Sequence, residues 1–542
     1  NCAKEIYFHI MKSAFTKATK FCIWFLFVLY PTSLYAQEVL GSPLYEYHRN
    51  LETANYFERN NLNIYSLSFS SWYEKDSNSQ HPWKNVLVDF QDKSATISSY
   101  ISLLPIHFNL SYNSKYSRGF NDGASWQGKG LNSNWSLGFQ YKIGGLSVVF
   151  APFLWYSQNL FFHLVPSVHE SPYAAYIPNI DLPQRFGDSP LLQFDWGETE
   201  IRYDVGSFTI GISNQNLWIG PTFFNALILS NNSGGFPRID LGIRKTDTIF
   251  GDVEALFLLG FLEGSSYADS SIKTKNRIIS GYSFSYAPVW IPGFTLGFHR
   301  TAIFYSDIWE TGDWLHSFLP MGSYMGEDQL DQRASITVNW SFPQIGFKVY
   351  AEWARNDFNN SIRTLIREIQ HSQAYTIGLQ HAILKTNKYT VLYKFEITET
   401  MHTIDYQTEV VLGRGTAGFY THHIVQHGYT NKGQLLGAAI DPGADSQYFG
   451  VAWYASFGSL EGYILRRSLN KDYIYGQPDS IRYHSVGSMG TEISLGFDAN
   501  FILNPKLIIS AGLSNSWMIA WNYTGLNDVF NIQTFVAVRS KI

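Results

Sequence analysis

Hydrophobic and polar residues alternate along most of the chain beyond residue 98. In the clearest segments, large apolar side chains occupy every second position, and small or polar residues, including Lys, Glu, Asp and Asn, occupy the positions between them. These segments are 135–143, 334–342, 391–398 and 492–501, and residues 208–213 follow the same pattern. A period of two residues predicts β-strands, each with one apolar and one polar face.

The connections between the predicted strands are alternately short and long. Four residues join strands 334–342 and 347–355, a long link covers 356–373, and another short turn covers 384–388. Outer-membrane barrels have short periplasmic turns and longer outside loops, so this order predicts which end faces the periplasm. Four apolar residues between 362 and 369 have helical spacing and predict a short amphipathic helix, with an irregular loop as the alternative.

The composition favours a membrane barrel over a soluble two-sheet sandwich, which would show the same alternation. Aromatic residues make up 17% of the chain and charged residues only 15%, against about 25% charged residues in soluble domains. Beyond residue 36 no apolar run approaches the ~18 residues of a spanning helix. We therefore predict an all-β fold, a transmembrane outer-membrane β-barrel of 16 or 18 antiparallel strands, with apolar side chains outside and a wet, polar lumen. A secreted soluble β-protein is the competing interpretation.

The start of the chain predicts export. Lysines precede an apolar run at 21–30, and the small residue Ala36 precedes Gln37. This pattern is typical of a signal peptide over residues 1–36, in which residues 1–10 lie upstream of a better start at Met11. The run is too short for a membrane anchor, which is the alternative. Both cysteines lie in this segment, so the mature chain has no disulfide or thiolate ligand. Loss of its four lysines and one glutamate takes the formal net charge from −5 to −8, which disfavours nucleic-acid binding.

The rest of the chain is predicted to have two parts. Residues 37–97 are polar, include a helical pattern near 42–56, and form a small N-terminal segment that sits in the periplasm or plugs the barrel. Residues 98–542 form the barrel. The last residue is Ile542, whereas such barrels commonly end in an aromatic residue; truncation, a variant assembly signal or a wrong fold assignment would each explain this.

One segment, residues 205–239, has a composition unlike a plain strand pair. After an alternating strand, it combines amides with a tryptophan, a Gly-Pro break and a turn cluster. Its notable residues are Asn214, Gln215, Trp218, Gly220, Pro221, Ser230, Asn231 and Asn232. Buried amides cost about 1–3 kcal/mol each unless they are hydrogen-bonded. We therefore expect a fixed polar network where the chain leaves the sheet, acting as a structural clamp, with a ligand site as the alternative.

This segment resembles the signature of the Wzi family of capsule-assembly proteins. It reads N-Q-x-x-W-x-G-P, then L-I-L-S-N-N and a nearby F-P. It departs from the family at Thr222, where a glycine is common, and at Ser233-Gly234, where Ala-Arg is common. A second block matches the family run G-Y-x-x-K/R-G-x-x-x-G, although Ala438 replaces the usual histidine. Its matching residues are Tyr429, Lys432, Gly433 and Gly437. A third block lies between 328 and 353.

The resemblance covers about 205–450 and implies an 18-stranded outer-membrane barrel with a helical periplasmic segment. It also implies a lectin-like role without chemistry or cofactor: binding and anchoring capsular or exopolysaccharide at the cell surface. The expected partners are this polysaccharide, outer-membrane lipid and the polysaccharide export machinery. Nucleic acid is not expected, and we expect a monomer. Outer-loop aromatic residues are candidates for glycan contact, namely Trp309, Trp314 and Tyr324.

No catalytic or metal-binding residue is predicted. The run around Ser189 resembles the nucleophile block of some esterases, but no Asp-x-x-His follows near the end of the chain. His422, His423 and His427 lack an accompanying carboxylate set, and His423 and His427 are expected to share one face of a strand.

The mid-strand residues Glu352 and Glu396 are expected to pair with lysines in a solvated charge ladder. Two alternatives to anchoring stay open. A porin or substrate-specific channel requires an open lumen. An outer-membrane hydrolase requires Ser189 or a His–Asp pair at the outer rim.

Overall fold

The computed structural model describes residues 38–59, 61–70, 72–74, 81–84, 99–308, 329–356, 363, 366, 369, 372–386, 388–401, 418–475 and 488–541. The predicted signal peptide, the candidate aromatic residues Trp309, Trp314 and Tyr324, and Ile542 lie outside these residues. Most of the helix expected near 362–369 also lies outside them. Within the described ranges, no helix is long and apolar enough to cross a membrane.

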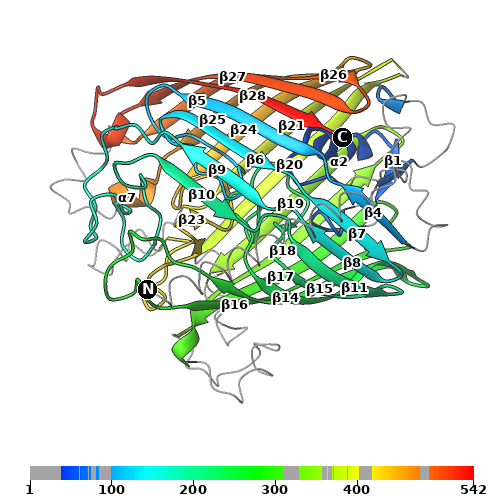
Figure 1. Cartoon of the computed structure of the whole chain (residues 1–542), viewed down its shortest axis with the longest axis horizontal. Helices are drawn as coiled ribbons and strands as arrows, with labels where there is room; N and C mark the ends of the chain where they lie inside the picture. Colours follow the sequence, from blue (N-terminus) through cyan, green and yellow to red (C-terminus); the bar gives the residue numbers. More distant parts are fainter. Residues whose placement is uncertain are drawn as a thin grey trace, which may run out of the picture.

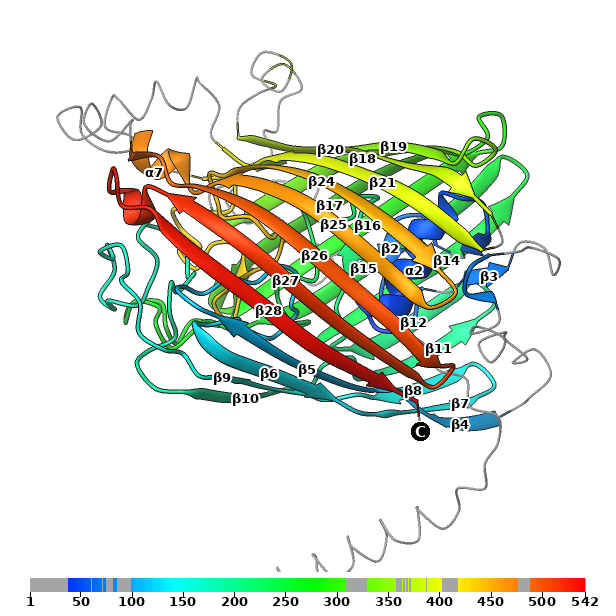
Figure 2. The ribbon, with the colours of Figure 1, turned by 90° about the horizontal axis from the view of Figure 1, so that it is seen from above.

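The described strands close into one antiparallel barrel (Figures 1 and 2). Fourteen strands are continuous: β12 (Phe208–Ser213), β14 (Arg238–Thr248), β15 (Gly251–Leu262), β16 (Arg277–Pro288), β17 (Phe294–Tyr305), β18 (Asp331–Phe342), β19 (Phe347–Asn356), β20 (Gln373–Lys385), β21 (Tyr389–Glu399), β24 (Asp445–Ala455), β25 (Gly458–Ser468), β26 (Thr491–Asn504), β27 (Leu507–Ile519) and β28 (Val529–Ser540).

Four further strands are each interrupted once. Their halves are β4 (Ser99–Leu103) and β5 (Ile106–Asn113), β6 (Gly130–Ser136) and β7 (Phe139–Ile143), β8 (Leu146–Phe150) and β9 (Phe153–Ser157), and β10 (Leu191–Asp195) and β11 (Glu200–Val205). Among these four strands, each half pairs with one half of the neighbouring strand: β4 with β7 and β5 with β6, β7 with β8 and β6 with β9, and β8 with β11 and β9 with β10. The described residues thus form 18 strands, as predicted, and β28 closes onto β5.

Proline or glycine stands at each interruption. Pro105 and Pro152 have no N–H for the β-ladder, and Gly197 has a φ of +54°. A Cβ atom on Gly138 would clash with the carbonyl oxygen of Phe150. The wall therefore bends along a line across four neighbouring strands. The expectation of one unbroken strand over 135–143 is wrong for this reason.

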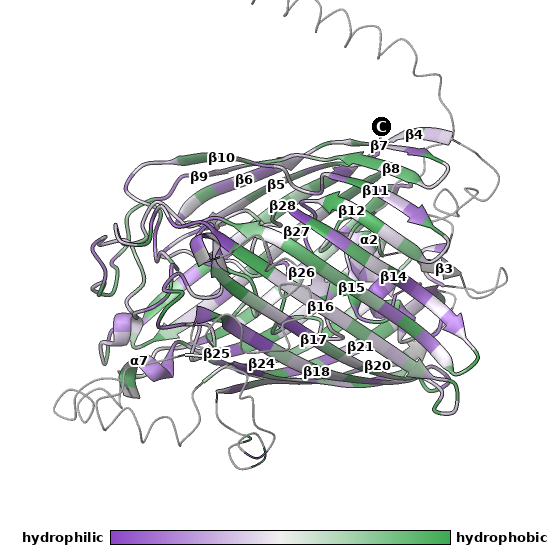
Figure 3. Cartoon of the chain, turned by 90° about the horizontal axis from the view of Figure 1, so that it is seen from below, coloured by the Kyte–Doolittle hydropathy of each residue, from purple (hydrophilic) through white to green (hydrophobic). Residues whose placement is uncertain are grey.

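The outer surface of the barrel is apolar, as the alternation predicts. In β12, Phe208, Ile210 and Ile212 are 66%, 49% and 63% exposed, whereas Thr209 and Ser213 between and after them are buried. Figure 3 shows the same alternation of hydrophobic and hydrophilic residues along the strands. Such a surface fits the hydrocarbon region of a bilayer.

The two ends of the barrel differ. Short turns, such as 343–346 between β18 and β19 and 456–457 between β24 and β25, lie at one end (Figure 1). The long connections lie at the other end, which also carries the short helices α7 (Lys471–Tyr475) and η6 (Trp521–Tyr523) and, after β17, η3 (Ser306–Ile308). By the rule that short turns are periplasmic, the long loops form the outer mouth.

The wall residues that face the lumen are polar, as predicted, but the lumen is filled by the chain itself, so the expectation that it is wet is wrong. The filling includes α2 (Pro43–Glu52), β2 (Ile64–Tyr65), β13 (Trp218–Ile219), and the hairpin β22 (Thr430–Asn431) and β23 (Gln434–Leu435), whereas β1 (Phe57–Arg59) and β3 (Trp72–Glu74) pair with each other at the short-turn opening (Figures 1 and 2). Figure 2 shows α2 enclosed by the wall strands. Leu227, Ile228, Leu229, Leu436 and Ile440 pack together in one apolar core cluster.

The N-terminal segment is anchored to the inner wall. Ser42 caps α2 by accepting a hydrogen bond from the backbone N–H of Tyr45 at 3.2 Å. The helix expected near 42–56 is thus present, and it covers Pro43–Glu52. Tyr47 stacks on Trp83 with ring centroids 3.8 Å apart. The indole Nε1 of Trp83 donates to the carbonyl oxygens of Ala455 and Gly458 at 2.9 and 3.1 Å. These contacts fix the segment at the short-turn end.

Buried carboxylates on the wall hold the filling by its backbone. Glu396 accepts hydrogen bonds from the backbone N–H groups of Phe223, Phe224 and Asn225 at 3.0, 3.3 and 2.7 Å. Glu352 accepts one from Leu227 at 3.0 Å. Both glutamates are at most 1% exposed, so the predicted solvated charge ladder is wrong.

Candidate functional site

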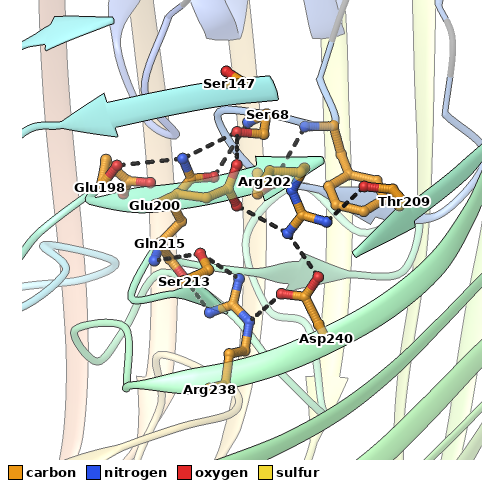
Figure 4. Close-up of polar contacts among 12 residues, drawn as sticks. Ser68, Ser147, Glu198, Glu200, Arg202, Thr209, Ser213, Gln215, Arg238 and Asp240 are labelled. Carbon is orange, nitrogen blue, oxygen red and sulfur yellow. Dashed lines mark hydrogen bonds and ion pairs between the residues drawn. The ribbon is translucent and has the colours of Figure 1, made fainter. Parts of the chain in front are cut away.

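The amide-rich block after β12 forms a buried polar network on the inner wall (Figure 4). Arg238 donates from Nη1 to the backbone oxygen of Gln215 at 2.5 Å, and from Nε to Asp240 at 3.2 Å. Arg202 pairs with the same Asp240 at 2.6 Å. The side chain of Gln215 accepts from the N–H of Ser68 at 3.2 Å, which ties the block to the N-terminal segment.

The Trp-x-Gly-Pro part of the block also contacts the N-terminal segment. Trp218 pairs with Tyr65 where β13 meets β2, and the guanidinium of Arg49 lies 4.8 Å from its ring centroid. The N–H of Gly220, which has a φ of +111°, donates to Asn63 at 2.9 Å. Only glycine adopts such a φ readily, and Pro221 follows it. The geometry here is that of a junction between chain segments, with Trp218 only 4% exposed.

The second block of family-like residues packs against the first. Lys432 and Gly433 have φ values of 51° and 77° and form the two-residue turn of the β22–β23 hairpin. The ammonium of Lys432 lies 2.8 Å from a carboxylate oxygen of Asp195 on the wall. Ser230 donates to the carbonyl oxygen of Gly437 at 2.5 Å, and Asn232 donates to that of Leu435 at 3.2 Å. Tyr429 is fully buried and stacks on Tyr420.

Above these blocks, the outer loops surround a cavity of about 250 Å³, which we call the outer cavity. Its walls come from the loops after β5, β9, β21 and β27, together with the end of β25. Ligand pockets are typically about 300–1,000 Å³, so this one suits a small unit of a ligand. The lining used below consists of Asp122, Trp126, Tyr176, Asn232, Gly433, Asp441, Trp521 and Tyr523.

Partly exposed aromatic rings gather at the outer cavity. Trp521 stacks on Tyr116 with centroids 4.7 Å apart, and the hydroxyl groups of Tyr176 and Tyr523 lie 2.9 Å apart. The loop that carries Trp521 is strained, because Ala520, Asn522, Tyr523 and Leu526 have φ values of 52° to 63°. Non-glycine residues in the left-handed region cost about 1–2 kcal/mol each, and such strain is common at ligand sites.

Two carboxyl groups line the same cavity. Burial raises the pKa of Asp122 to about 7, and burial also raises the pKa of Asp441 above its usual range. Two basic lining residues, Arg118 and Arg467, share the one carboxylate of Glu492 at 2.8 and 3.0 Å, so this cluster keeps one positive charge in excess near the two carboxyl groups. The cavity thus offers aromatic faces beside hydrogen-bond acceptors.

The structure separates the residues that the sequence singles out. Asn232 and Gly433 line the outer cavity, whereas Asn214, Gln215, Trp218, Ser230, Asn231 and Tyr429 are buried in the junction beneath it. Sequence reasoning missed Trp126, Tyr176, Trp521 and Tyr523. The Trp-Asn-Tyr run at 521–523 was the available signal, but aromatic residues are common throughout this chain.

The groups considered for chemistry are not assembled into a reactive site. Ser189 is exposed, and its carbonyl oxygen accepts a hydrogen bond from the side-chain amide of Asn159. A His–Asp pair does exist at the rim, with His169 Nδ1 2.9 Å from Asp269, but its Nε2 faces the carbonyl oxygen of Ile177. Both ring nitrogens therefore face acceptors, which leaves none to serve as a base.

The histidines near residue 425 lie in a loop, so their expected placement on a strand is wrong. His422 accepts from the backbone N–H of Val425 at 3.0 Å, and burial lowers the pKa of His427 to about 3. Among the described residues, no group of three or more His, Cys, Asp or Glu side chains is placed to hold a metal ion.

An 18-stranded antiparallel cylinder with an apolar exterior and a lumen occupied by its own chain defines an outer-membrane β-barrel protein. The family model for the capsule assembly protein Wzi matches residues 110–518, and the chain belongs to this family. No curated protein matches the sequence.

Among solved structures, the chain resembles Wzi of Escherichia coli, described as an outer-membrane carbohydrate-binding β-barrel involved in group 1 capsule assembly. The identity is 11%, the match covers 94% of this chain and 100% of that one, and the TM-score is 0.60. It also matches OccAB4 of Acinetobacter baumannii at 10% identity over 83% of this chain and 100% of that one, with a TM-score of 0.40. OprD of Pseudomonas aeruginosa matches at 10% identity, 82% and 95% coverage and a TM-score of 0.38.

Proposed function

We propose that this protein binds capsular or exopolysaccharide at the outer mouth of the barrel and holds it at the cell surface, without catalysing a reaction. The observation that carries the proposal is the outer cavity, where the rings of Trp521, Tyr523 and Tyr176 lie beside the carboxyl groups of Asp122 and Asp441. Aromatic faces pack on the apolar C–H faces of sugar rings, and carboxylates accept hydrogen bonds from hydroxyl groups. Membership of the Wzi family and the carbohydrate binding described for the Escherichia coli protein support it.

The filled lumen favours anchoring over a porin or channel. The core around Leu227 and Ile440 occupies the space that a channel would need. The double acceptor environment of His169 favours binding over hydrolysis.

Further parts of the proposal concern organisation. Residues 1–36 are removed on export, residues 37–97 plug the barrel formed by 98–542, and the buried family residues from Asn214 to Asn232 act as a structural clamp. The protein acts as a monomer in outer-membrane lipid and works beside the polysaccharide export machinery. The contacts of Trp83 and Gln215 described above support the plug and the clamp.

The test compares cell-bound with released polysaccharide in a gene-deletion strain that carries wild-type protein or a variant. We expect the deletion to release polysaccharide and Trp521→Ala to retain about tenfold less than wild type, since each 1.4 kcal/mol of binding energy is tenfold in affinity. Leu526→Ala is the matched control, because this residue lies in the same loop and is fully exposed. Unchanged retention in the deletion strain would exclude the proposed function.

A further inference from the structure

A second cavity lies deeper in the barrel, and we call it the inner cavity. It has a volume of about 230 Å³ and lies between residues 39–43 of the N-terminal segment and the wall at the interrupted strands. Asp122 lines both the inner and the outer cavity. The two spaces are therefore neighbours on either side of the chain segment 121–124.

The inner cavity is rich in amide groups. Its lining includes five asparagines, Asn109, Asn121, Asn134, Asn216 and Asn231. The side-chain oxygens Oδ1 of Asn109 and Oδ1 of Asn121, and Oε2 of Glu198, are buried and have no hydrogen-bond donor within the part of the chain that the structure describes. A buried acceptor without a donor costs about 1–3 kcal/mol, so these atoms call for an occupant that brings several donors.

The charges around the inner cavity disfavour an anionic occupant, because its lining includes the carboxyl groups of Asp122, Asp195 and Glu198. Arg539 is paired with Glu38, and Asp195 is paired with Lys432 at 2.8 Å. The remaining need is for neutral donors that point in several directions. Hydroxyl groups of a sugar supply such donors, and each hydroxyl also accepts from amide N–H groups. Water offers the same kinds of donor and acceptor, and the inner cavity has room for about seven water molecules at roughly 30 Å³ each.

We propose that the inner cavity is a second carbohydrate subsite, which takes an uncharged, hydroxyl-rich sugar unit from a glycan whose neighbouring unit occupies the outer cavity. The proposal rests on the proposed function. The proposal extends the bound ligand from one sugar unit in the outer cavity to a glycan that runs inward past Asp122.

The segment 121–124 has to move for a glycan to span both cavities. Hydrogen bonds run from the N–H of Gly123 to the carbonyl oxygen of Asn231 at 2.7 Å and from Asn231 Nδ2 to that of Asn121 at 2.8 Å. Two more run from Asn121 Nδ2 to the carbonyl oxygen of Phe224 at 2.9 Å and from Gln434 Nε2 to that of Gly123 at 3.3 Å. Each of these contacts is a hydrogen bond to a backbone carbonyl group, so the segment can be released by exchanging hydrogen-bond partners. Asn231, one of the family residues, thereby holds in place the segment that separates the two subsites.

The first test varies the length of the ligand. The probes are fragments of one to four sugar units, prepared by partial depolymerisation of the surface polysaccharide of the producing strain, and affinity is measured by calorimetry on the detergent-solubilised protein. We expect affinity to rise about tenfold from one to three units in wild type. Asn109→Leu places an apolar group in the inner cavity, so it should lose this tenfold gain and keep the affinity for one unit. Tyr112→Leu on the outer face of the same strand is the matched control.

A second variant keeps the proposal testable if Asn109→Leu fails to fold. A Cβ on Gly234 would lie 2.8 Å from the Cβ of Ala124, slightly closer than the roughly 3.5–4.5 Å of a disulfide. Both cysteines of the chain fall in the predicted signal peptide, so Ala124→Cys with Gly234→Cys introduces the sole cysteine pair of the mature form. Oxidation should lock segment 121–124 and abolish the length-dependent gain, and reduction should restore it.

The outcomes separate the two proposals. If wild type gains no affinity with length, or if the locked protein and Asn109→Leu keep the full gain, the inner cavity holds water only and the further inference is wrong. If fragments of every length fail to bind to wild type, the proposed function itself falls.

Discussion

Replacing Glu396 tests whether wall carboxylates hold the filling of the barrel in place. Glu396→Ala removes the acceptor of three backbone N–H groups, at 2.7 to 3.3 Å, and of the Tyr350 hydroxyl at 2.8 Å. Each buried donor left unpaired costs about 1–3 kcal/mol. Three amides together cost about 3–9 kcal/mol if they stay dry, so we expect residues 223–225 to detach from the wall and take water instead.

Hydrogen exchange of the segment measures this detachment. At 1.4 kcal/mol per factor of ten, a loss of about 3 kcal/mol speeds exchange of the three amides by roughly 100-fold or more. Glu352→Ala is the graded comparison, because Glu352 holds the one amide of Leu227 and should give a smaller effect, about tenfold. The barrel itself should stay folded in both variants, as judged by its heat-dependent migration on gels. Equal exchange in wild type and Glu396→Ala would refute the reasoning.

Two further predictions concern the clamp and the outer cavity. Trp218→Ala combined with Asn231→Ala should reduce folding or membrane insertion, because loss of a buried tryptophan costs about 3–5 kcal/mol; normal insertion with shed polysaccharide would contradict the structural role. Burial raises the pKa of Asp122 from 3.8 to about 7, so the folded state binds more protons than the unfolded state between these values and loses up to about 4 kcal/mol as the pH rises through them. We expect the Tm of wild type to fall between pH 5 and pH 8 more than that of Asp122→Asn, and parallel Tm curves would count against a buried carboxyl group.

The wall of the barrel could be predicted because its residues obey a simple rule. In 334–342 each apolar side chain meets lipid and each polar one turns inward, so the period of two is visible without any partner being known. The interruptions of the strands were harder to predict. Gly138 is a small residue in an otherwise regular pattern, and the requirement for glycine arises from the carbonyl oxygen of Phe150 on the neighbouring strand, which a Cβ atom would clash with.

The filling could not be predicted in the same way. Leu227 to Leu229 pack on residues some two hundred positions away, and no periodicity marks such contacts. Glu396 lies near a lysine in the sequence, which suggests a solvated ion pair on the wall. The structure shows instead that it accepts hydrogen bonds from three backbone amides of the filling, and the sequence does not indicate these partners. The cavity aromatics belong to separate loops whose meeting depends on closure of the barrel.

One ion pair links the two extremes of the described chain. Arg539 in the closing strand β28 pairs with Glu38, which precedes α2 inside the barrel. The guanidinium points inward and is 2% exposed, so it can pair with Glu38 only when the N-terminal segment lies within the barrel. A barrel that closed without this segment would leave the Arg539 guanidinium facing the lumen without the carboxylate with which it pairs, so the ion pair favours closure of the wall around the N-terminal segment.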